Sequence, residues 1–409
     1  RLPSYEELCE CASSESLDPG PFESSWDALL EDLNAPAALG ELFVAIKPLE
    51  KELAEGNVPE DTKKAALHGL AFLVHAFGWV LPEIESEQLA LDVPEEDGGL
   101  GFSNTDTAIL SEVLGYYMPI IPIFSSGVVF KHILLNSRKE KKDELLTEII
   151  SGQKIGTFAV YENDKYEINE NTISTQLTPT DSGFKLNGNK KYVMFGDVSD
   201  YIAVLAKIED SFKFILLPTD AEGVEVKPTT SLDQTRPMCE VIMQEVELGQ
   251  DSVLIDLDKD LSEWKKIKNI ALGYLAMEQV GASQACLDMS TEYAKERIQF
   301  GRPIGSFQAI QHICANMLMQ LESAKSVAYS AVRVDYSDNI ETEMSSMLAK
   351  SYCSEVFNKI AGDNIQVHGG IGFTWEHPAH LYFKKAKSDS LLLGTPKLAR
   401  DKIAELLSL

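Results

Sequence analysis

Long apolar runs are missing from this 409-residue chain, although 44% of its residues are hydrophobic. No stretch approaches the roughly 20 uninterrupted apolar residues that a membrane-spanning helix requires, so the sequence argues against a membrane span. The N-terminus is acidic, with Glu6, Glu7 and Glu10, which suits neither a secretory signal nor an arginine-rich transit peptide. We therefore expect a cytoplasmic protein, or a mitochondrial matrix protein in a eukaryote.

Basic residues are scarce. The chain has 36 lysines and arginines against 64 acidic residues, which gives a formal net charge of −28. A surface of this sign keeps a protein in solution but repels nucleic acid and anionic membranes. We therefore expect no nucleic-acid partner.

Cysteine pairs and metal-ligand spacings are also absent. The six cysteines are scattered, and Cys9 and Cys11 are too close together and too isolated for a zinc site. His368, His377 and His380 lack the spacing of a catalytic triad or a metal site. We predict no metal site and a reducing compartment.

Changes in periodicity divide the chain into four parts. Residues 1–40 form an acidic extension, and residues 41–152 repeat apolar side chains at the three- and four-residue spacing of helices. Residues 153–258 form short extended runs, and residues 259–409 return to a helical period. The predicted fold is an α+β multidomain protein with an N-terminal all-α domain, a central β-barrel and a C-terminal four-helix bundle.

The predicted barrel has tight turns and no intervening helix. Asp181–Gly183 and Asn187–Gly188 are hairpin turn signals. The expected strands are 155–161, 173–177, 184–186, 191–194, 201–207, 212–217 and 240–248. In the bundle we expect a long helix ending near Phe300, a second from about Ile310, and further helices at about 340–367 and 378–408.

The junction of the first two bundle helices carries the most specific signal. Tyr293–Gly305 runs from a helix end through a charged, aromatic Gly-Pro turn, and Ser306–His312 starts the next helix. Arg297, Gln299 and Phe300 stand there in fixed order. Such a set suits a phosphate-bearing aromatic ligand, because guanidinium pairs with phosphate and a ring packs on a ring.

The domain order and three segments resemble the acyl-CoA dehydrogenase family of flavoproteins. The segments are Pro94–Phe102, Tyr293–Gln311 and Ile365–Pro378, and the last is most similar to the bacterial branch that handles bulky acyl-CoA substrates. The resemblance implies FAD bound across a dimer interface, with the adenosine diphosphate end on a neighbour's bundle. It also implies these cofactor-binding positions: Arg297, Gln299, Phe300, Gln308, Gln366, Gly369, Gly370 and Thr395.

The positions that would hold the flavin ring depart from the family pattern. The resemblance implies a glycine-rich loop with a hydroxyl after the first barrel strand, but Ala159–Tyr166 contains no glycine, serine or threonine. A second motif ends in threonine or serine in the family and reads Tyr192-Val193-Met194 here. A thioether cannot replace the short hydrogen bond of a hydroxyl.

The residue at the position of the catalytic base also differs from the family pattern. Dehydrogenation needs a carboxylate that removes a proton from the substrate α-carbon. The family places it before a Gly-Thr pair, where this chain has Leu393, or on the first bundle helix near Ala271. Neither residue can accept a proton, so no catalytic residue is intact. Asp389 and Glu278 are the alternatives.

These losses favour a non-catalytic subunit that completes the FAD site of a catalytic paralogue. Such a complex would act on an acyl-CoA substrate, and the resemblance implies an electron-transfer flavoprotein as a further partner. Two alternatives stay open. One is a self-sufficient flavoenzyme with a relocated base or with oxidase or monooxygenase chemistry, and the other is a flavin-free scaffold.

Overall fold

The computed structural model describes residues 93–94, 97, 104–163, 168, 171–334 and 340–409. The chain divides into two compact units, residues 1–85 and 86–409, and every described residue belongs to the second. The predicted extension over 1–40 and much of the predicted helical domain over 41–152 lie outside the described residues.

The first described elements are helical. They are α5 (Asn104–Tyr117), the π-helix η4 (Ile123–Phe130), α6 (Lys131–Leu135) and α7 (Lys139–Ile150). Helix α5 packs against the first bundle helix, α8 (Ser262–Glu296), at two glycines. A Cβ at Gly281 would lie 1.7 Å from the carbonyl oxygen of Glu112, and one at Gly115 would lie 1.9 Å from that of Glu278. Only glycine permits so close a crossing.

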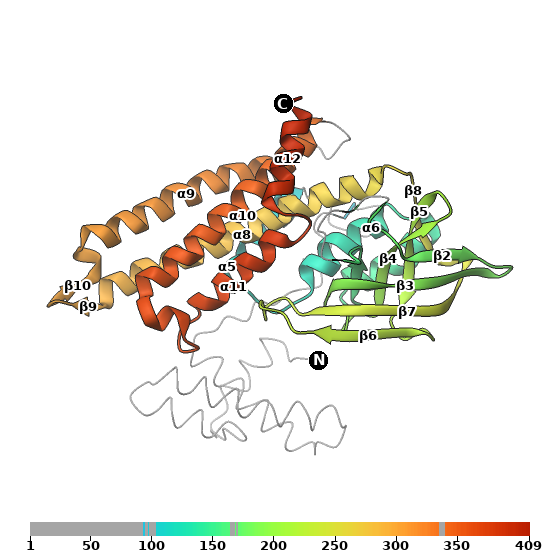
Figure 1. Ribbon diagram of the computed structural model, residues 1–409, viewed down its shortest axis with the longest axis horizontal. Coiled ribbons are helices and arrows are strands. Elements are labelled where there is room, and N and C mark those ends of the chain that lie inside the picture. The colour runs from blue at the N-terminus through green and yellow to red at the C-terminus, as the bar shows by residue number, and fades with distance from the viewer. Residues whose placement is uncertain (1–92, 95–96, 98–103, 164–167, 169–170, 335–339) are drawn as a thin grey trace, which may run out of the picture. The chain divides into compact units, whose positions relative to one another are not determined.

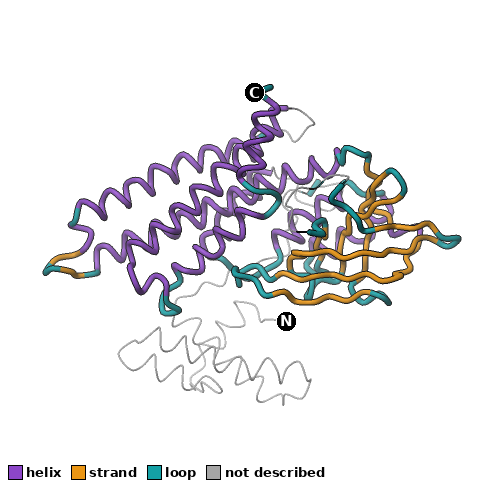
Figure 2. The backbone as a smooth tube through the Cα atoms, viewed as in Figure 1, coloured by secondary structure: helices purple, strands orange, loops and turns teal. Residues whose placement is uncertain are grey.

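A single eight-stranded sheet follows, and Figures 1 and 2 show it beside the bundle. Its strands are β1 (Gly156–Ala159), β2 (Gln176–Pro179), β3 (Gly183–Met194), β4 (Tyr201–Ile208), β5 (Ser211–Pro218), β6 (Val224–Thr229), β7 (Met238–Gly249) and β8 (Val253–Leu257), with the 3₁₀ turn η5 (Gln250–Ser252) before the last. Neighbouring strands run in the order β6-β7-β3-β2-β4-β5-β8, and β1 pairs in parallel with β4.

The prediction of a closed β-barrel is wrong for the described residues. Closure requires the first and last strands of the sheet to pair, but β6 pairs only with β7, and β8 only with β5. Strand β1 joins β4 instead of closing the edge, so the sheet branches. Strands β6 and β8 were not predicted, and the runs predicted at 184–186 and 191–194 belong to the one strand β3.

Of the two predicted hairpin turns, one is confirmed. The chain turns between β2 and β3 just before Gly183, where the Gly183 amide donates to the Thr180 hydroxyl. Asn187–Gly188 instead lies inside β3, where the register against β7 shifts. A Cβ at Gly188 would come within 2.5 Å of Thr175, so this glycine allows a bulge and a close approach of backbones.

The C-terminal bundle contains five α-helices among the described residues. After α8 come the two short strands β9 (Ile298–Gln299) and β10 (Arg302–Pro303), the 3₁₀ turns η6 (Ile304–Ser306) and η7 (Gly369–Phe373), and the helices α9 (Gln308–Arg333), α10 (Ile340–His368), α11 (Ala379–Leu391) and α12 (Pro396–Leu406). The single helix predicted over 378–408 is therefore wrong. It breaks because Leu393 and Gly394 have positive φ angles and Pro396 lacks the N–H that would continue it.

Both faces of the sheet are buried at β4, whereas most residues of β6 are exposed. Along β4, Ala203 and Leu205 join the large core shared with the helices, whereas Ile202 and Val204 join a second core enclosed by the strands. Trp264, near the start of α8, packs against Phe158 and Phe214 and anchors the bundle to the sheet. Among the described helices, none combines the length and apolarity needed to cross a membrane.

Candidate functional site

The junction of α8 and α9 projects from one end of the bundle as a small hairpin of β9 and β10 (Figure 1). Phe300 and Gly301 occupy its turn with φ angles of 54° and 76°. Two positive φ angles are the requirement of a type I′ turn, in which asparagine or glycine is the usual first residue. Phenylalanine in this position is strained, and its ring is 92% exposed.

The second predicted cofactor segment lies at the same end. Tyr293, one helical turn before Arg297, stacks on His368 with ring centroids 4.4 Å apart. His368 ends α10, and the exposed residues Gly369 and Gly370 follow it. A Cβ at either glycine would meet nothing within 4 Å, which leaves room for a ligand or another chain.

The structure therefore places most of the predicted cofactor residues together. Exposed residues at this end include Arg297, Gln299, Phe300, Gln308, Gln366, Gly369 and Gly370. Thr395 lies elsewhere, at the N-terminus of α12, where its hydroxyl accepts a hydrogen bond from the Leu398 amide at 3.2 Å. It caps a helix and is not part of the hairpin end.

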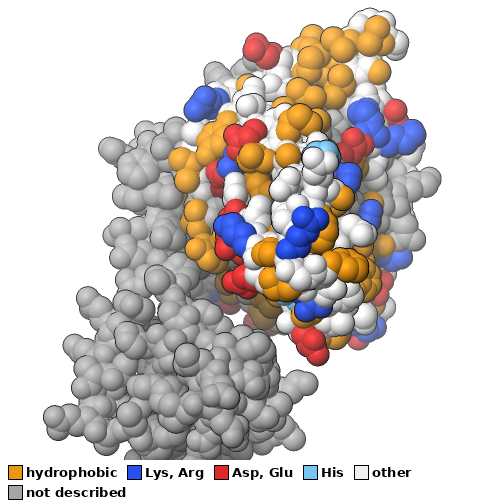
Figure 3. Space-filling view, turned by 90° about the vertical axis from the view of Figure 1, so that its left-hand side faces the viewer, with side chains coloured by type: hydrophobic (Ala, Val, Ile, Leu, Met, Phe, Trp, Pro, Cys, Tyr) orange, Lys and Arg blue, Asp and Glu red, His pale blue; other side chains and the backbone are white. Residues whose placement is uncertain are grey.

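Cations and aromatic rings alternate at the hairpin end, and Figure 3 views the molecule from this side, where basic and hydrophobic side chains lie interspersed. The Arg302 guanidinium lies 4.2 Å from the centroid of the Phe307 ring, and the Lys384 ammonium 4.5 Å from that of Trp375. Burial and the nearby imidazoles lower the pKa of His377 to about 4, so it is neutral at pH 7. Exposed rings beside fixed cations suit a flat ligand that carries phosphates.

The position predicted for a catalytic base contains no acid. Leu393 is buried in the turn between α11 and α12 and has a φ of 59°. Ala271, on α8, is also fully buried. Neither side chain carries a proton acceptor.

The two alternative carboxylates are buried in one ion cluster. Glu278 lies 2.7 Å from both Arg236 and Lys385, and Asp389 lies 3.4 Å from Arg236 and 3.6 Å from Lys385. Burial would raise the pKa of Glu278, but the two cations outweigh it and lower that pKa to about 2. A carboxylate with so low a pKa is a weak base.

The two cations of this cluster, Arg236 and Lys385, could not be predicted from a sequence motif. Arg236 precedes β7, and Lys385 lies on α11, about 150 residues away in the chain. Arg236 also stacks on Phe124, 5.1 Å from its ring centroid, and donates to the Met194 sulfur at 3.8 Å. Because these residues meet only through the packing of the sheet on the bundle, no local pattern could have revealed them.

The predicted ring-binding segment is held by a second buried ion pair. Glu162 lies 2.6 Å from Lys190 and also accepts hydrogen bonds from Ser174 and from the Thr175 amide. Burial would raise the pKa of Glu162, but Lys190 and these donors lower it to about 2. Glu162 therefore fixes the segment internally and is not directed at a ligand.

Among the described residues, those at the hairpin end fit one part of an FAD molecule better than those on the ring side fit the other. The exposed rings, cations and glycines of the hairpin end suit the adenosine diphosphate part. On the ring side, the cavity beside Tyr161 and Tyr192 measures about 200 Å³ and the one beside Met194 about 40 Å³. Both are below the range of about 300–1,000 Å³ typical of small-molecule sites.

Comparison with known proteins gives two matching family models. Residues 84–153 match the acyl-CoA dehydrogenase N-terminal domain, and residues 273–408 match the acyl-CoA dehydrogenase C-terminal domain. The acyl-CoA dehydrogenase IpdE2 of Mycolicibacterium smegmatis is 32% identical over 309 residues, which cover 75% of this chain and 80% of the relative. A subunit of the caffeyl-CoA reductase–Etf complex of Acetobacterium woodii, CarC, is 26% identical over 78% of this chain and 86% of its own.

Solved structures have the same fold. Butyryl-CoA dehydrogenase from Megasphaera elsdenii aligns with a TM-score of 0.74 at 22% identity, over 79% of this chain and 88% of that one. The ChsE4–ChsE5 complex from Mycobacterium tuberculosis aligns with a TM-score of 0.70 at 23% identity, over 80% and 86%. FAD is the typical cofactor of these oxidoreductases. On this evidence the chain belongs to the acyl-CoA dehydrogenase family.

Proposed function

We propose that this chain is the non-catalytic subunit of a heteromeric, FAD-dependent acyl-CoA dehydrogenase. Its hairpin end would complete the FAD site of a catalytic paralogue that dehydrogenates a bulky acyl-CoA thioester. When bound, FAD supplies the hydride acceptor of that reaction. This chain's residues would bind and orient the cofactor's phosphates and adenine.

The observation that carries the proposal is Phe300. A ring that is 92% exposed, in a backbone conformation that phenylalanine disfavours, reduces the stability of the isolated chain. Exposed apolar residues in strained turns are characteristic of binding surfaces. Arg297 begins the same hairpin and provides the charge that a pyrophosphate would pair with.

The two positions where the resemblance implies a base are Leu393 and Ala271, and this supports the non-catalytic part. Burial raises the pKa of Asp389, but its side chain is fully buried beside Arg236 and Lys385. Leu393 has no ionisable group, and the carboxylate of Glu278 is ion-paired on two sides. Releasing Glu278 would leave Arg236 and Lys385 buried without their closest anion, which costs several kcal/mol. A relocated base at Glu278 is therefore unfavourable.

Two relatives support a heteromeric assembly. One aligned structure is a complex of two differently named chains, ChsE4 and ChsE5. CarC is a subunit of a complex with Etf, in line with an electron-transfer flavoprotein as a further partner of the assembled enzyme. Both likenesses are with proteins below 30% identity, so they support the assembly type and not its particular substrate.

The test is co-expression with an acyl-CoA dehydrogenase paralogue that keeps the ring-loop hydroxyl and the carboxylate before its Gly-Thr pair. We expect a mixed complex with flavin absorbance and turnover, while the chain purified alone retains little FAD. Arg297→Ala should reduce flavin retention in the complex. Arg333→Ala, at the end of α9, is the matched control and should leave it unchanged.

Two results would favour the alternatives. Stoichiometric FAD and dehydrogenase turnover in the chain alone would make it a self-sufficient enzyme. Absence of flavin in complexes with every paralogue tested would make it a scaffold.

A further inference from the structure

Three aromatic rings from different elements stack on one another at the hairpin end. The Tyr293 ring of α8 and the His368 ring of α10 have centroids 4.4 Å apart and planes inclined by 27°. The His377 ring, just before the start of α11, has its centroid 4.1 Å from that of His368. The stack therefore joins the ends of α8 and α10 to the start of α11.

Both segments predicted to bind the cofactor begin at this stack. The Arg297 amide donates to the carbonyl oxygen of Tyr293 at 2.9 Å, and the glycine pair 369–370 directly follows His368. A Cβ at Gly372 would lie 2.9 Å from the His368 Cβ, so the turn after the glycine pair packs against the same histidine. The spacing between Arg297 and the glycine pair therefore depends on how the two rings pack.

Hydrogen bonds fix the His368 ring in one orientation. Its Nδ1 lies 2.8 Å from the carbonyl oxygen of Asn364, and because a carbonyl only accepts, Nδ1 carries the proton. The Asn364 Oδ1 in turn accepts a hydrogen bond from the Ser290 hydroxyl of α8 at 2.8 Å. Nε2 of His368 is buried and has no hydrogen-bond partner. A second proton on this ring would therefore be a buried, unpaired charge.

The His377 ring is held neutral as well. Its Nδ1 accepts from the Ala379 amide at 3.2 Å, so a proton on Nδ1 would break this hydrogen bond at the first residue of α11. Burial, together with the His368 and His380 imidazoles, lowers the pKa of His377 to about 4. The charged and titratable groups around the stack are Tyr293 of α8, His368 of α10, His380 and Lys384 of α11, and the exposed Glu376. Two neutral imidazoles stack at this distance, whereas two cations would repel each other.

We propose that Tyr293 and His368 are positioning residues, whose stacked rings hold the two cofactor-binding segments at the spacing that one ligand requires. The inference rests on the proposed function, in which that ligand is the FAD of the catalytic partner. It adds the side chains that preorganise the hairpin end. It also makes ligand release sensitive to acid, because an opened stack exposes histidines that take up protons.

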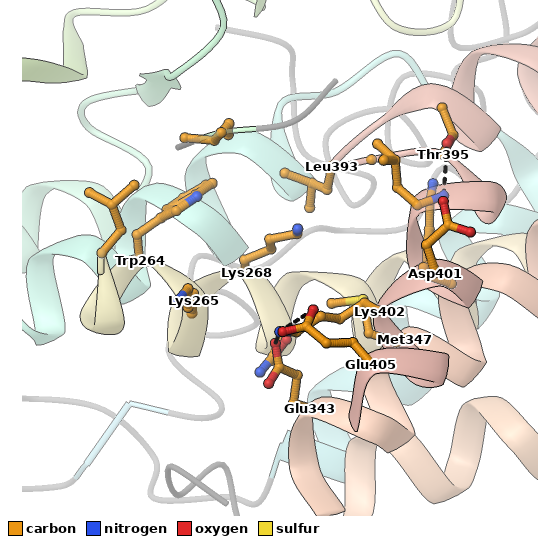
Figure 4. Close-up of a pocket in the computed structure, with 17 residues that line it drawn as sticks. Trp264, Lys265, Lys268, Glu343, Met347, Leu393, Thr395, Asp401, Lys402 and Glu405 are labelled. Atoms are coloured by element: carbon orange, nitrogen blue, oxygen red, sulfur yellow. Dashed lines mark hydrogen bonds and ion pairs between the residues drawn. The ribbon is translucent and has the colours of Figure 1, made fainter. Parts of the chain in front are cut away.

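The opposite ends of α8 and α10 line a cavity of about 400 Å³ together with α12 (Figure 4). Its wall includes Trp264, Met347 and Thr395, and none of the three stacked rings. A change confined to the stack should therefore leave the amides of this wall unaffected. They provide an internal reference for measurements on the hairpin end.

The first test compares Tyr293→Leu, which removes one ring, with Tyr293→Phe, which keeps it. In a mixed complex with the catalytic paralogue, Tyr293→Leu should release flavin about tenfold faster on dilution, and Tyr293→Phe should match the wild type. Flavin fluorescence gives the rate. Release from Tyr293→Leu at the wild-type rate, or equally fast release from both variants, would overturn the proposal.

Hydrogen exchange in the chain alone separates this proposal from the proposed function. In folded Tyr293→Leu, checked by thermal melting, amides at 298–304 and 369–373 should exchange faster, whereas those of the cavity wall in Figure 4 should not. Unchanged exchange at the hairpin end, or faster exchange in both places, would refute a positioning role. A wild-type complex without flavin would refute the proposed function and leave this measurement valid.

The pH dependence gives a readout that packing alone would not produce. The pKa of His377 is about 4 in the closed stack and returns to the ordinary 6.5 when the stack opens, so the open fraction should rise about tenfold between pH 7.5 and 5.5. Flavin release from the wild-type complex should accelerate by the same factor. His377→Phe keeps a ring that cannot take up a proton, so its release should change less than about twofold over this interval. Equal acceleration in His377→Phe would place the acid effect elsewhere and overturn the proposal.

Discussion

From the strained turn at Phe300 we predict that one substitution stabilises the isolated chain and weakens its mixed complex. Phe300→Asn creates the Asn-Gly pair that type I′ turns favour. A left-handed conformation costs an ordinary residue about 1–2 kcal/mol, and asparagine much less. Because the ring is 92% exposed, little burial is lost. We expect the isolated chain to gain about 1 kcal/mol in free energy of unfolding, or roughly 1.5 °C in Tm for a unit of this size.

The same substitution should weaken the mixed complex. Burying a phenylalanine side chain at an interface contributes about 1.5–3 kcal/mol, so its loss should reduce partner or flavin affinity about 10- to 100-fold. Thermal melting of the chain alone gives the first quantity, and flavin retention during dilution of the complex gives the second. Phe300→Tyr keeps both the ring and the strain and should change neither.

Two results would contradict this reasoning. A lower stability of Phe300→Asn would mean that the ring is supported within the chain. Unchanged assembly would mean that the exposed ring has no partner.

Three further predictions concern the folded chain. Arg236→Ala leaves two carboxylates buried without their guanidinium and should destabilise the chain by about 3–5 kcal/mol in urea unfolding. Glu162→Gln leaves Lys190 buried and unpaired, at a cost of about 3 kcal/mol at pH 7. Folding lowers the pKa of Glu162 from 4.5 to about 2. Its contribution to the free energy of unfolding is therefore complete above pH 4.5 and is lost as the pH falls toward 2, so the stability difference between wild type and variant should shrink over that window. A difference that stays constant with pH would contradict the ion pair. Gly281→Ala forces apart two touching helix backbones and should destabilise the chain by about 1–3 kcal/mol, whereas Gly370→Ala should be neutral in melting of the isolated chain.

The sequence predicted those parts of the fold that depend on local patterns. Long helices such as α8 and α10 followed from apolar spacing, and the change to strands near Ile155 was visible in composition. The open edge at β6 was not predictable, because strand closure depends on which edges meet in space. Asn187–Gly188 was wrongly predicted as a turn for a related reason. In the sequence, a glycine that allows a neighbouring strand to approach cannot be distinguished from a glycine that a turn requires.

The residues of the candidate site also divide into those that a local motif predicts and those that only the folded structure brings together. Arg297, Phe300 and Gly369 could be proposed from sequence because each lies in a short, ordered motif. The ion cluster around Glu278 could not, because Arg236 and Lys385 reach it from distant parts of the chain. Their presence changes Glu278 from a candidate base into an ion-paired group.

The ion cluster has a consequence for the order of assembly. Arg236 and Lys385 pair with Glu278 and Asp389 inside the fold, so none of these buried charges depends on a bound cofactor for its partner. This subunit would then accumulate as a stable apoprotein whatever the cellular supply of riboflavin. Under the proposed function, flavin would enter with the catalytic partner. Cofactor insertion would then be a late step, and the partner's abundance would limit formation of the active enzyme.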